Sequence, residues 1–335
     1  MKYKKILVTG ADGFIGSHLV EKLIKSGFSV RAFVNYNFQN HWGWLDHVDE
    51  KIKKEVEVIS GDIRDFDCVK SAVNKCDYIF NLAALIGIPY SYRAPKSYLD
   101  TNLIGLLNIM NSVKEKNSTR IIHTSTSEVY GSALFVPMTE EHPLNAQSPY
   151  AASKIAADQL AISFYKSFNL PISIIRPFNT YGPRQSLRAI IPTIITQILD
   201  KKLSKIKLGN INVKRDFNFI SDTVSGFIST IKTEKIIGET INIGNNYEIT
   251  IKEIFKIISR QTNIHKQIII DKPRVRSVGT EVKRLCASNK KAKKILGWEP
   301  KFKNKIGIEK GIKIAIDWYK KVENIKKFKT DIYNI

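Results

Sequence analysis

The amino-acid sequence predicts an α/β fold in which a doubly wound parallel sheet is followed by a smaller α/β region. Short apolar runs alternate with amphipathic stretches through the first half of the chain, and three regularly spaced glycines follow the first run. Strands that alternate with helices form parallel sheets with right-handed crossovers. This rhythm changes after Pro177, which marks the second region. The 335 residues are enough to bury the core of one large domain or of two closely packed domains.

The first half of the chain contains the regular elements. The run KKILVT at 4–9 is the first expected strand, and the amphipathic stretch from Phe14 to Ser26 is the first helix, which Gly27 ends as a C-cap. The same patterns predict strands at 29–34, 56–60, 77–81, 120–124 and 172–176. They predict further helices at 66–75, 97–116 and 149–168.

The second half lacks regular strand–helix units. We expect helices near 190–201, 221–232, 250–261, 289–296 and 305–321, and strands near 205–208, 240–243 and 266–270. The change of pattern divides the chain into a first domain over 1–178, to whose sheet 211–244 returns, a second domain over 179–210 and 245–325, and a tail over 326–335.

A net charge of +22 is the unusual feature of the composition. The lysines are spread along the chain and are not interleaved with aromatic residues, so we expect solvated lysine-rich faces and no nucleic-acid partner. A second contributor to the positive charge is the binding of an anionic, nucleotide-linked substrate. The apolar start breaks at Thr9-Gly10, too early for a signal sequence or a membrane span, so we expect no membrane partner. Three cysteines without metal-ligand spacing favour a reducing cytoplasm and no metal site.

Gly10, Gly13 and Gly16 connect the first strand to the first helix. Glycine allows a tight turn and the close approach of a pyrophosphate to the helix N-terminus, where free N–H groups favour anions. Three-spaced glycines alone are a weak signal, and a structural turn is the alternative. Their place between strand and helix favours a Rossmann-type dinucleotide site, with Phe14 and Ile15 in the phosphate-binding turn.

Further cofactor contacts are expected where the following strands end. Asp62, followed by Ile63, comes after the third strand, where its carboxylate can accept the adenine amino group; a helix cap is the alternative. The fourth strand ends in small residues that let a cofactor pass closely, namely Leu82, Ala83 and Ala84. The second strand ends near Asn35 without the acid that usually binds the ribose of NAD, and no arginine follows to bind the phosphate of NADP. Both cofactors therefore stay open at this point.

Tyr150 and Lys154 are spaced Y-x-x-x-K in the helix expected at 149–168. Residues four apart share one helix face, so we expect the ammonium of Lys154 to lie next to the phenol of Tyr150 and to lower the phenol pKa. Such a pair takes a hydroxyl proton while hydride leaves the same carbon for a nicotinamide. Glu128 adds a second base, which a simple alcohol dehydrogenase does not need. The alternative is a tyrosine and a lysine that only cover a helix face.

Six motifs resemble, in their order, the extended short-chain dehydrogenases/reductases that act on nucleotide sugars: TGADGFIGSHL, GDIRD, NLAA, STSEVYG, YAASK and RPFNTYGPR. The triplet Thr126-Ser127-Glu128 is similar to the catalytic triplet of sugar-nucleotide 4,6-dehydratases of the GDP-mannose type. Three segments, AFVNYNFQNHWGWLD, AALIGIPYSYRAP and IIPTIITQI, resemble the N-acetylglucosamine-nucleotide 4,6-dehydratases that begin legionaminic-acid biosynthesis for cell-surface glycans.

The resemblance implies that Tyr150 takes the proton of the sugar C4 hydroxyl while hydride passes to NAD, with NADP as the alternative. Lys154 would hold the phenolate and the cofactor ribose, and Thr126 would bind the C4 oxygen. Glu128 would then remove the C5 proton, water would leave from C6, and the hydride would return to C6. The product is a 4-keto-6-deoxy sugar. Ser127 is too weak an acid to protonate the leaving hydroxyl. We expect Glu128 to shuttle that proton; the alternative is that Ser127 orients a water or the C6 hydroxyl.

The resemblance also implies residues that bind a nucleotide diphosphate and its sugar, and arginine suits phosphates because it binds them bidentately. The candidates are Arg184, Arg215, Arg276, Asn179, Ser91 and Tyr92. In this family the helices equivalent to 97–116 and 149–168 form a dimeric four-helix bundle, so we expect a homodimer or a dimer of dimers. A UDP-glucuronate decarboxylase and a 4-epimerase of the same fold stay open as alternatives, as do guanosine and uridine for the base.

Overall fold

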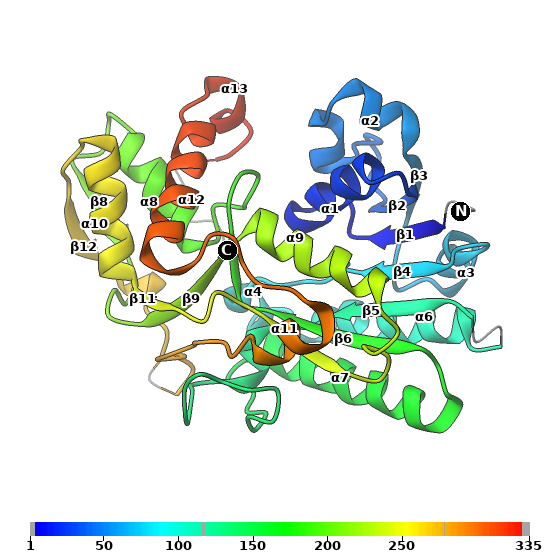
Figure 1. Ribbon diagram of the computed structural model, residues 1–335. Coiled ribbons are helices and arrows are strands. Elements are labelled where there is room, and N and C mark those ends of the chain that lie inside the picture. The colour runs from blue at the N-terminus through cyan, green and yellow to red at the C-terminus, as the bar shows by residue number, and fades with distance from the viewer. Residues whose placement is uncertain (1–3, 116–117, 278, 330–335) are drawn as a thin grey trace.

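A seven-stranded parallel sheet forms the centre of the larger region in the computed structural model, which describes residues 4–115, 118–277 and 279–329 (Figure 1). The strands follow the order β10-β6-β5-β4-β1-β2-β3, and every neighbouring pair is parallel. Their bounds are β1 Lys5–Thr9, β2 Ser29–Asn35, β3 Glu57–Gly61, β4 Tyr78–Asn81, β5 Arg120–Thr124, β6 Ile172–Pro177 and β10 Thr240–Ile243. The doubly wound α/β class predicted from the alternation of patterns is confirmed.

Helices cover both faces of this sheet (Figure 1). One face carries α1 (Phe14–Lys25) and α9 (Ile220–Ser229), and the other carries α3 (Phe66–Val73), α6 (Gly105–Val113) and α7 (Pro149–Phe168). Successive residues of a strand point to opposite faces. Ile6 and Val8 therefore join the core beneath α1, whereas Leu7 joins the core beneath α6. Because both faces are buried, the strands read as continuous apolar runs in the sequence.

The smaller region contains a three-stranded sheet, β11-β9-β7, and a two-stranded sheet of β12 and β8. The strand bounds are β7 Asn179–Tyr181, β8 Lys205–Leu208, β9 Lys214–Phe219, β11 Glu248–Thr250 and β12 Gln267–Ile270. The helices of the second half are α8 Ile190–Leu199, α10 Ile251–Thr262, α11 Lys290–Leu296, α12 Asn304–Tyr319 and α13 Val322–Ile325. The sequence did not predict β7 and β11, because three-residue strands are too short to show a period. The predicted domain bounds stay a prediction.

The long helix predicted over 97–116 is divided in the structure. It consists of α5 (Pro95–Leu99), a π-helical turn η2 (Asp100–Ile104) and α6. The π turn contains Asn102, whose side-chain amide bonds to both backbone groups of Leu85 and to the Ser153 hydroxyl. The turn thereby connects the loop after β4 to α7, next to the predicted catalytic residues. Residue 116 lies outside the described residues, as do 330–335 of the predicted tail.

Short elements that the sequence did not predict connect the main ones. They are η1 Gly43–His47, α2 Glu50–Glu55, α4 Ile88–Ser91, η3 Ser127–Tyr130, η4 Thr230–Lys232 and η5 Lys272–Arg274. Among the described residues, no helix combines the length and the apolar character that crossing a bilayer requires.

Candidate active site

The loop between β1 and α1 is packed so closely that side chains would not fit at two of its glycines. A Cβ on Gly10 would lie 2.8 Å from the Ala83 nitrogen, and one on Gly16 would lie 2.1 Å from the carbonyl oxygen of Gly10. Gly13 is the N-cap of α1 and offers no side-chain cap, and the first turn of the helix contains no acidic residue. The N–H groups at this helix end, including those of Phe14 and Ile15, are therefore available to an anion.

The end of β4 is fixed against this loop. The Thr9 hydroxyl donates to Asn81 Oδ1 at 2.8 Å and accepts the N–H groups of Leu82 and Ala83, each at 3.1 Å. The small residues that follow, up to Ala84, thus lie beside the glycine turn. The close packing of the glycine turn against the backbone after β4 fits a dinucleotide whose pyrophosphate approaches the main chain closely.

Two further predicted cofactor residues lie at the same edge of the sheet. Asn35 ends β2 and is exposed. The Asp62 carboxylate follows β3 and accepts hydrogen bonds from the backbone N–H and the guanidinium of Arg64 at 2.9 and 3.0 Å. The guanidinium also lowers the pKa of Asp62. The next residue, Ile63, is buried. Asp62 therefore keeps only part of its acceptor capacity for an adenine amino group.

Tyr150 and Lys154 lie one above the other in the first turns of α7. Ser148 begins this helix as its N-cap and accepts the N–H of Ala151 at 3.1 Å, with Pro149 as the first helical residue. Both predicted catalytic side chains are buried. The Lys154 Nζ atom donates to the Thr124 carbonyl oxygen at the end of β5, at 2.6 Å.

The direction of the pKa shift of Tyr150 differs from the prediction. Burial raises the pKa of Tyr150, and a hydrogen bond to Thr126 opposes that shift only in part. This is the opposite of the lowering that we expected from Lys154. Burial instead lowers the pKa of Lys154 to about 8, against the attraction of Asp158. The physical reason is desolvation, which disfavours both the phenolate and the ammonium, and which a helical spacing does not reveal.

Thr126 and Glu128 extend the pair toward solvent. Thr126 is the N-cap of η3, and its hydroxyl accepts the N–H of Glu128 at 3.2 Å while it also bonds to Tyr150. The Glu128 side chain lines a cavity, whereas Ser127 is buried and is not part of the cavity wall. The predicted triplet therefore presents one carboxylate to the cavity, near enough to Tyr150 to raise the pKa of its phenol.

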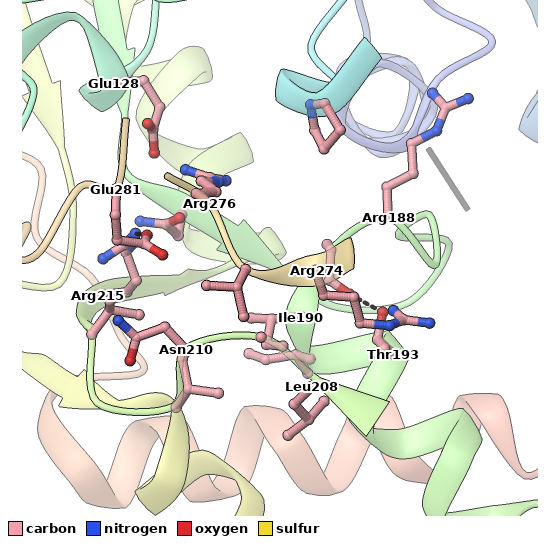
Figure 2. A pocket seen from close by; sticks show the side chains of 18 of the residues that line it. Glu128, Arg188, Ile190, Thr193, Leu208, Asn210, Arg215, Arg274, Arg276 and Glu281 are labelled. Carbon is pink, nitrogen blue, oxygen red and sulfur yellow. Dashed lines mark hydrogen bonds and ion pairs between the residues drawn. The ribbon is translucent and has the colours of Figure 1, made fainter. Parts of the chain in front are cut away.

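A cavity of about 630 Å³ separates Glu128 from the second region. Arg215 and Arg276 line it together with Glu281, and Figure 2 shows the Glu128 carboxylate directed toward the Arg276 guanidinium, with Arg188 on the far side. Arg215 is buried, and Arg215 Nη2 lies 3.5 Å from Glu281 Oε1. Burial lowers the pKa of Arg215.

Several polar atoms in the cavity wall have no protein partner. Within the described part of the chain, no hydrogen-bond partner is found for Asn179 Nδ2, Gln185 Oε1 or Arg276 Nη1, although all three atoms are buried. Buried polar groups are normally paired, so three unpaired atoms on residues that line one cavity indicate a polar ligand. The arginines in the cavity wall favour a negatively charged ligand, such as a diphosphate.

Two predicted substrate contacts lie elsewhere. Arg184 forms an ion pair with Glu21 at 2.7 Å and donates to the Ser17 hydroxyl, so it binds α1 and does not line the cavity. Ser91 is fully buried and donates to the Ile88 carbonyl oxygen at 2.7 Å; its neighbour Tyr92 lines the cavity instead. The partner of Arg184 is distant in sequence, so no local pattern reveals this pairing.

The cavity also includes residues that the sequence did not single out. They are Gln185, Arg188, Asn210 and Glu281. Gln185 and Arg188 follow the predicted Arg184 within four residues, so they belong to the loop that the sequence indicated. Asn210 and Glu281 occur in polar segments that look like ordinary surface.

Behind Lys154, charges are buried together in the core. Asp158 accepts hydrogen bonds from the Ser125 hydroxyl at 2.8 Å and from the Arg176 guanidinium at 2.9 Å, and it lies 3.7 Å from the ring of His123. Burial lowers the pKa of His123 well below its usual value. The Asp158 carboxylate thus pairs with the Arg176 guanidinium and also attracts the Lys154 ammonium. Among the described residues, no cluster of His, Cys, Asp or Glu could hold a metal ion.

A doubly wound fold with a glycine turn before the first helix, and with a Tyr–Lys pair linked through Thr126 and Glu128 to an arginine-lined cavity, is typical of extended short-chain dehydrogenases/reductases, NAD-dependent enzymes of nucleotide-sugar chemistry. The comparison with known families makes the assignment narrower. A sequence model of the GDP-mannose 4,6-dehydratase family matches residues 7–311, and the chain belongs to that family.

Relatives within this family catalyse different reactions. A UDP-N-acetyl-alpha-D-glucosaminuronate decarboxylase from Bacillus cytotoxicus is 30% identical, covering 96% of this chain and 99% of its own. A dTDP-glucose 4,6-dehydratase from Streptomyces venezuelae, solved with NAD, has a TM-score of 0.86 at 26% identity, covering 97% and 99% of the two chains. A UDP-glucuronic acid 4-epimerase from Bacillus cereus, solved with UDP-glucuronic acid and NAD, has a TM-score of 0.84 at 28% identity, covering 94% and 99%.

Proposed function

We propose that this protein is a nucleotide-sugar 4,6-dehydratase, a lyase that converts GDP- or UDP-N-acetylglucosamine to the 4-keto-6-deoxy sugar. One observation carries the proposal. The Glu128 carboxylate lines the cavity, and the Thr126 hydroxyl links its backbone to the Tyr150 phenol. Two bases can therefore act on adjacent carbons of one sugar ring.

Each residue has a defined part in the proposed reaction. Tyr150 takes the proton of the C4 hydroxyl, and Thr126 holds the C4 oxygen. NAD, when bound, would supply the redox chemistry, which is the transfer of hydride away from C4 and back to C6. The C4 ketone acidifies the C5 hydrogen, which Glu128 removes, and the hydroxyl leaves C6 as water. When hydride has returned to C6, C5 regains a proton, which balances the proton that Tyr150 took from the C4 hydroxyl. In this proposal the ammonium of Lys154, one turn further along α7, stabilises the phenolate once the proton has gone.

The proton for the leaving hydroxyl comes from Glu128 in this proposal. Ser127 is buried outside the cavity wall, and a serine hydroxyl is too weak an acid for the step. Glu128 has just taken a proton from C5 and faces the same space, so it can return that proton at C6.

The resident cofactor of the proposal is NAD, and the glycine loop, Asn35, Asp62 and the end of β4 would hold it. The motif resemblance supports the N-acetylhexosamine substrate and a place at the start of legionaminic-acid biosynthesis. The three cysteines are free thiols, which supports a cytoplasmic location. Leu99 and Ile104 are exposed apolar residues on α5 and η2, which supports a homodimer through these helices and α7.

The test is an assay for loss of water. Purified protein with NAD is incubated with GDP- and with UDP-N-acetylglucosamine, and mass spectrometry follows the loss of one water from either substrate. In Glu128→Gln we expect product formation to fall by ~10²-fold or more, because general acid–base catalysis is lost. Reduced nicotinamide should still form on addition of the substrate, because Tyr150 and Lys154 are intact. Glu141→Gln, which changes an exposed acid, is the matched control.

Other outcomes would assign another family reaction. Release of carbon dioxide from a nucleotide-linked glucuronate would identify a decarboxylase, and a C4 epimer of unchanged mass would identify an epimerase. A near-normal rate of water loss by Glu128→Gln would contradict the role of Glu128.

A further inference from the structure

Asp12 lies in the glycine loop, and its carboxylate is turned toward the end of β2. The backbone N–H of Asn35, the last residue of β2, donates a hydrogen bond to this carboxylate. The loop is fixed to the same strand by the N–H of Ala11, which donates to the Phe33 carbonyl oxygen at 3.3 Å. A side chain that begins between the phosphate-binding glycines therefore ends beside the second strand.

The segment after β2 holds Asp12 in this place. The Trp44 N–H donates to the Asp12 carbonyl oxygen at 3.0 Å. Gly43, with φ of +58°, approaches so closely that a Cβ on it would lie 2.9 Å from the Asp12 Cβ. Burial raises the pKa of Asp12, and the hydrogen bond from Asn35 opposes that shift. The carboxylate is thus partly desolvated and fixed, not a freely moving surface group.

The position of the Asp12 carboxylate affects how a dinucleotide can bind. In doubly wound folds the acid that binds the ribose hydroxyls next to the adenine stands at the end of the second strand, where it also repels the 2′-phosphate of NADP. This chain has Asn35 at that strand end, but the Asp12 carboxylate reaches the same backbone from the neighbouring loop.

Three cations, on β2 and on the segments that follow β2 and β3, are bound to other groups. Arg31 donates to Glu57 at 3.0 Å and to the carbonyl oxygens of Ala72 and Asn74. Arg64 is paired with Asp62 at 2.5 Å. His41 lies 3.6 Å from Asp46. The carboxylate of Asp12 would repel the 2′-phosphate of NADP. These three cations are already paired with acids and would not offset that repulsion.

We infer that Asp12 takes the place of the missing strand-end acid. Its carboxylate accepts a hydrogen bond from the 2′-hydroxyl of the adenosine ribose and makes the site select NAD over NADP. The inference rests on the proposed NAD-dependent function and answers a question that the family assignment leaves open.

The experiment compares binding of the two cofactors and does not depend on turnover. Full-length protein is equilibrated with equal concentrations of NAD and NADP and passed through a desalting column, and the nucleotides released by denaturation are quantified by chromatography. We expect the wild-type chain to retain NAD in at least ~10-fold excess. Asp12→Asn should reduce that excess by ~10-fold, because it keeps the acceptor for Asn35 but removes the charge.

Two further variants make the result decisive. Asp49→Asn changes the charge by the same amount at the N-cap of α2, where asparagine caps equally well, and should keep the wild-type ratio. Asp12→Ser repeats the test with a smaller acceptor if the asparagine variant is poorly folded. An unchanged ratio in the Asp12 variants, or a wild-type preference for NADP, would overturn the inference while leaving the dehydratase proposal intact. Failure of the wild-type chain to retain either nucleotide would instead count against both.

Discussion

The proposed reaction needs the positive charge of Lys154, whereas the burial of this side chain disfavours that charge. Only 3% of the residue is exposed, and burial lowers its pKa from 10.5 to about 8. At neutral pH the ammonium is kept in the folded protein at the expense of stability, because an unfolded lysine holds its proton up to higher pH. Asp158 reduces this penalty by its opposite charge.

Replacing this lysine should stabilise the fold while removing activity. In the folded protein the pKa is lower than in the unfolded chain, so the penalty is complete below about pH 8 and is lost as the pH rises from about 8 to 10.5. At pH 7 we expect Lys154→Met to raise the unfolding free energy by up to roughly 3 kcal/mol, at about 1.4 kcal/mol for each pKa unit.

Denaturant unfolding at pH 7 and pH 10 measures this effect. The gain should be smaller at pH 10, where the wild-type lysine is neutral. Lys166→Met, an exposed lysine on the same helix, should leave the unfolding free energy unchanged. If the Lys154→Met variant is less stable than wild type at pH 7, the buried charge does not destabilise the fold.

At this scale the sequence predicted which residue types share a helix face but not their electrostatics. The spacing of Tyr150 and Lys154 places them together on α7. The direction of the Tyr150 pKa depends on burial against Ile88 and Tyr98, which come from α4 and α5, about fifty residues earlier in the chain. No local pattern contains that information.

At the scale of elements, most strands and helices could be predicted because both faces of the main sheet are buried. Each strand then gives an unbroken apolar run, and each helix gives an amphipathic period. The π turn at Asp100–Ile104 could not be predicted, because it depends on side-chain bonds from Asn102 to Leu85 and Ser153. The strands β7 and β11 exist only as partners of β9.

The proposed dimer is a prediction about the helices α5, α6 and α7. Ile104 is 38% exposed on the π turn, close to the exposed Leu99. Ile104→Asp should place a charge in the proposed helical interface and shift the protein toward a monomer, because an unpaired buried charge is strongly unfavourable. Small-angle scattering should give twice the chain mass of 38.1 kDa for wild type and a lower mass for the variant.

An exposed isoleucine on a different helix provides the control. Ile306, on α12, is 70% exposed, and Ile306→Asp should keep the mass of the wild-type protein. A wild-type mass equal to one chain would contradict the proposed dimer.

At the scale of the whole molecule, an aromatic cluster joins the segment after β2 to the C-terminal part of the chain. Trp44, in η1 of the larger region, packs against Trp318 of α12 with ring centres 5.6 Å apart and against Phe328 at 5.7 Å. Lys327 Nζ lies 5.5 Å from the centre of the Trp44 ring. The same Trp44 binds the backbone of Asp12, so the cluster connects the C-terminal segment to the glycine loop.

Removing the Trp44 ring should loosen this connection. We expect Trp44→Ala to lower the unfolding free energy by about 2 kcal/mol, less than for a fully buried tryptophan because this one is partly exposed. Amide hydrogen exchange of α13 should become faster. Phe38→Ala in the same segment removes a ring that is 88% exposed and should have no effect on either measurement. Equal stability of the two variants would contradict the stabilising role of the cluster.

The last strand to join the main sheet also determines how the chain can be divided. β10 pairs with β6 only after the polypeptide has passed through β7, β8 and β9, and β6 has no other neighbour on that side. Neither region is therefore a contiguous stretch that a gene could encode alone. A truncated product ending at residue 178 would present a bare hydrogen-bonding edge along β6, which invites other chains to add to it.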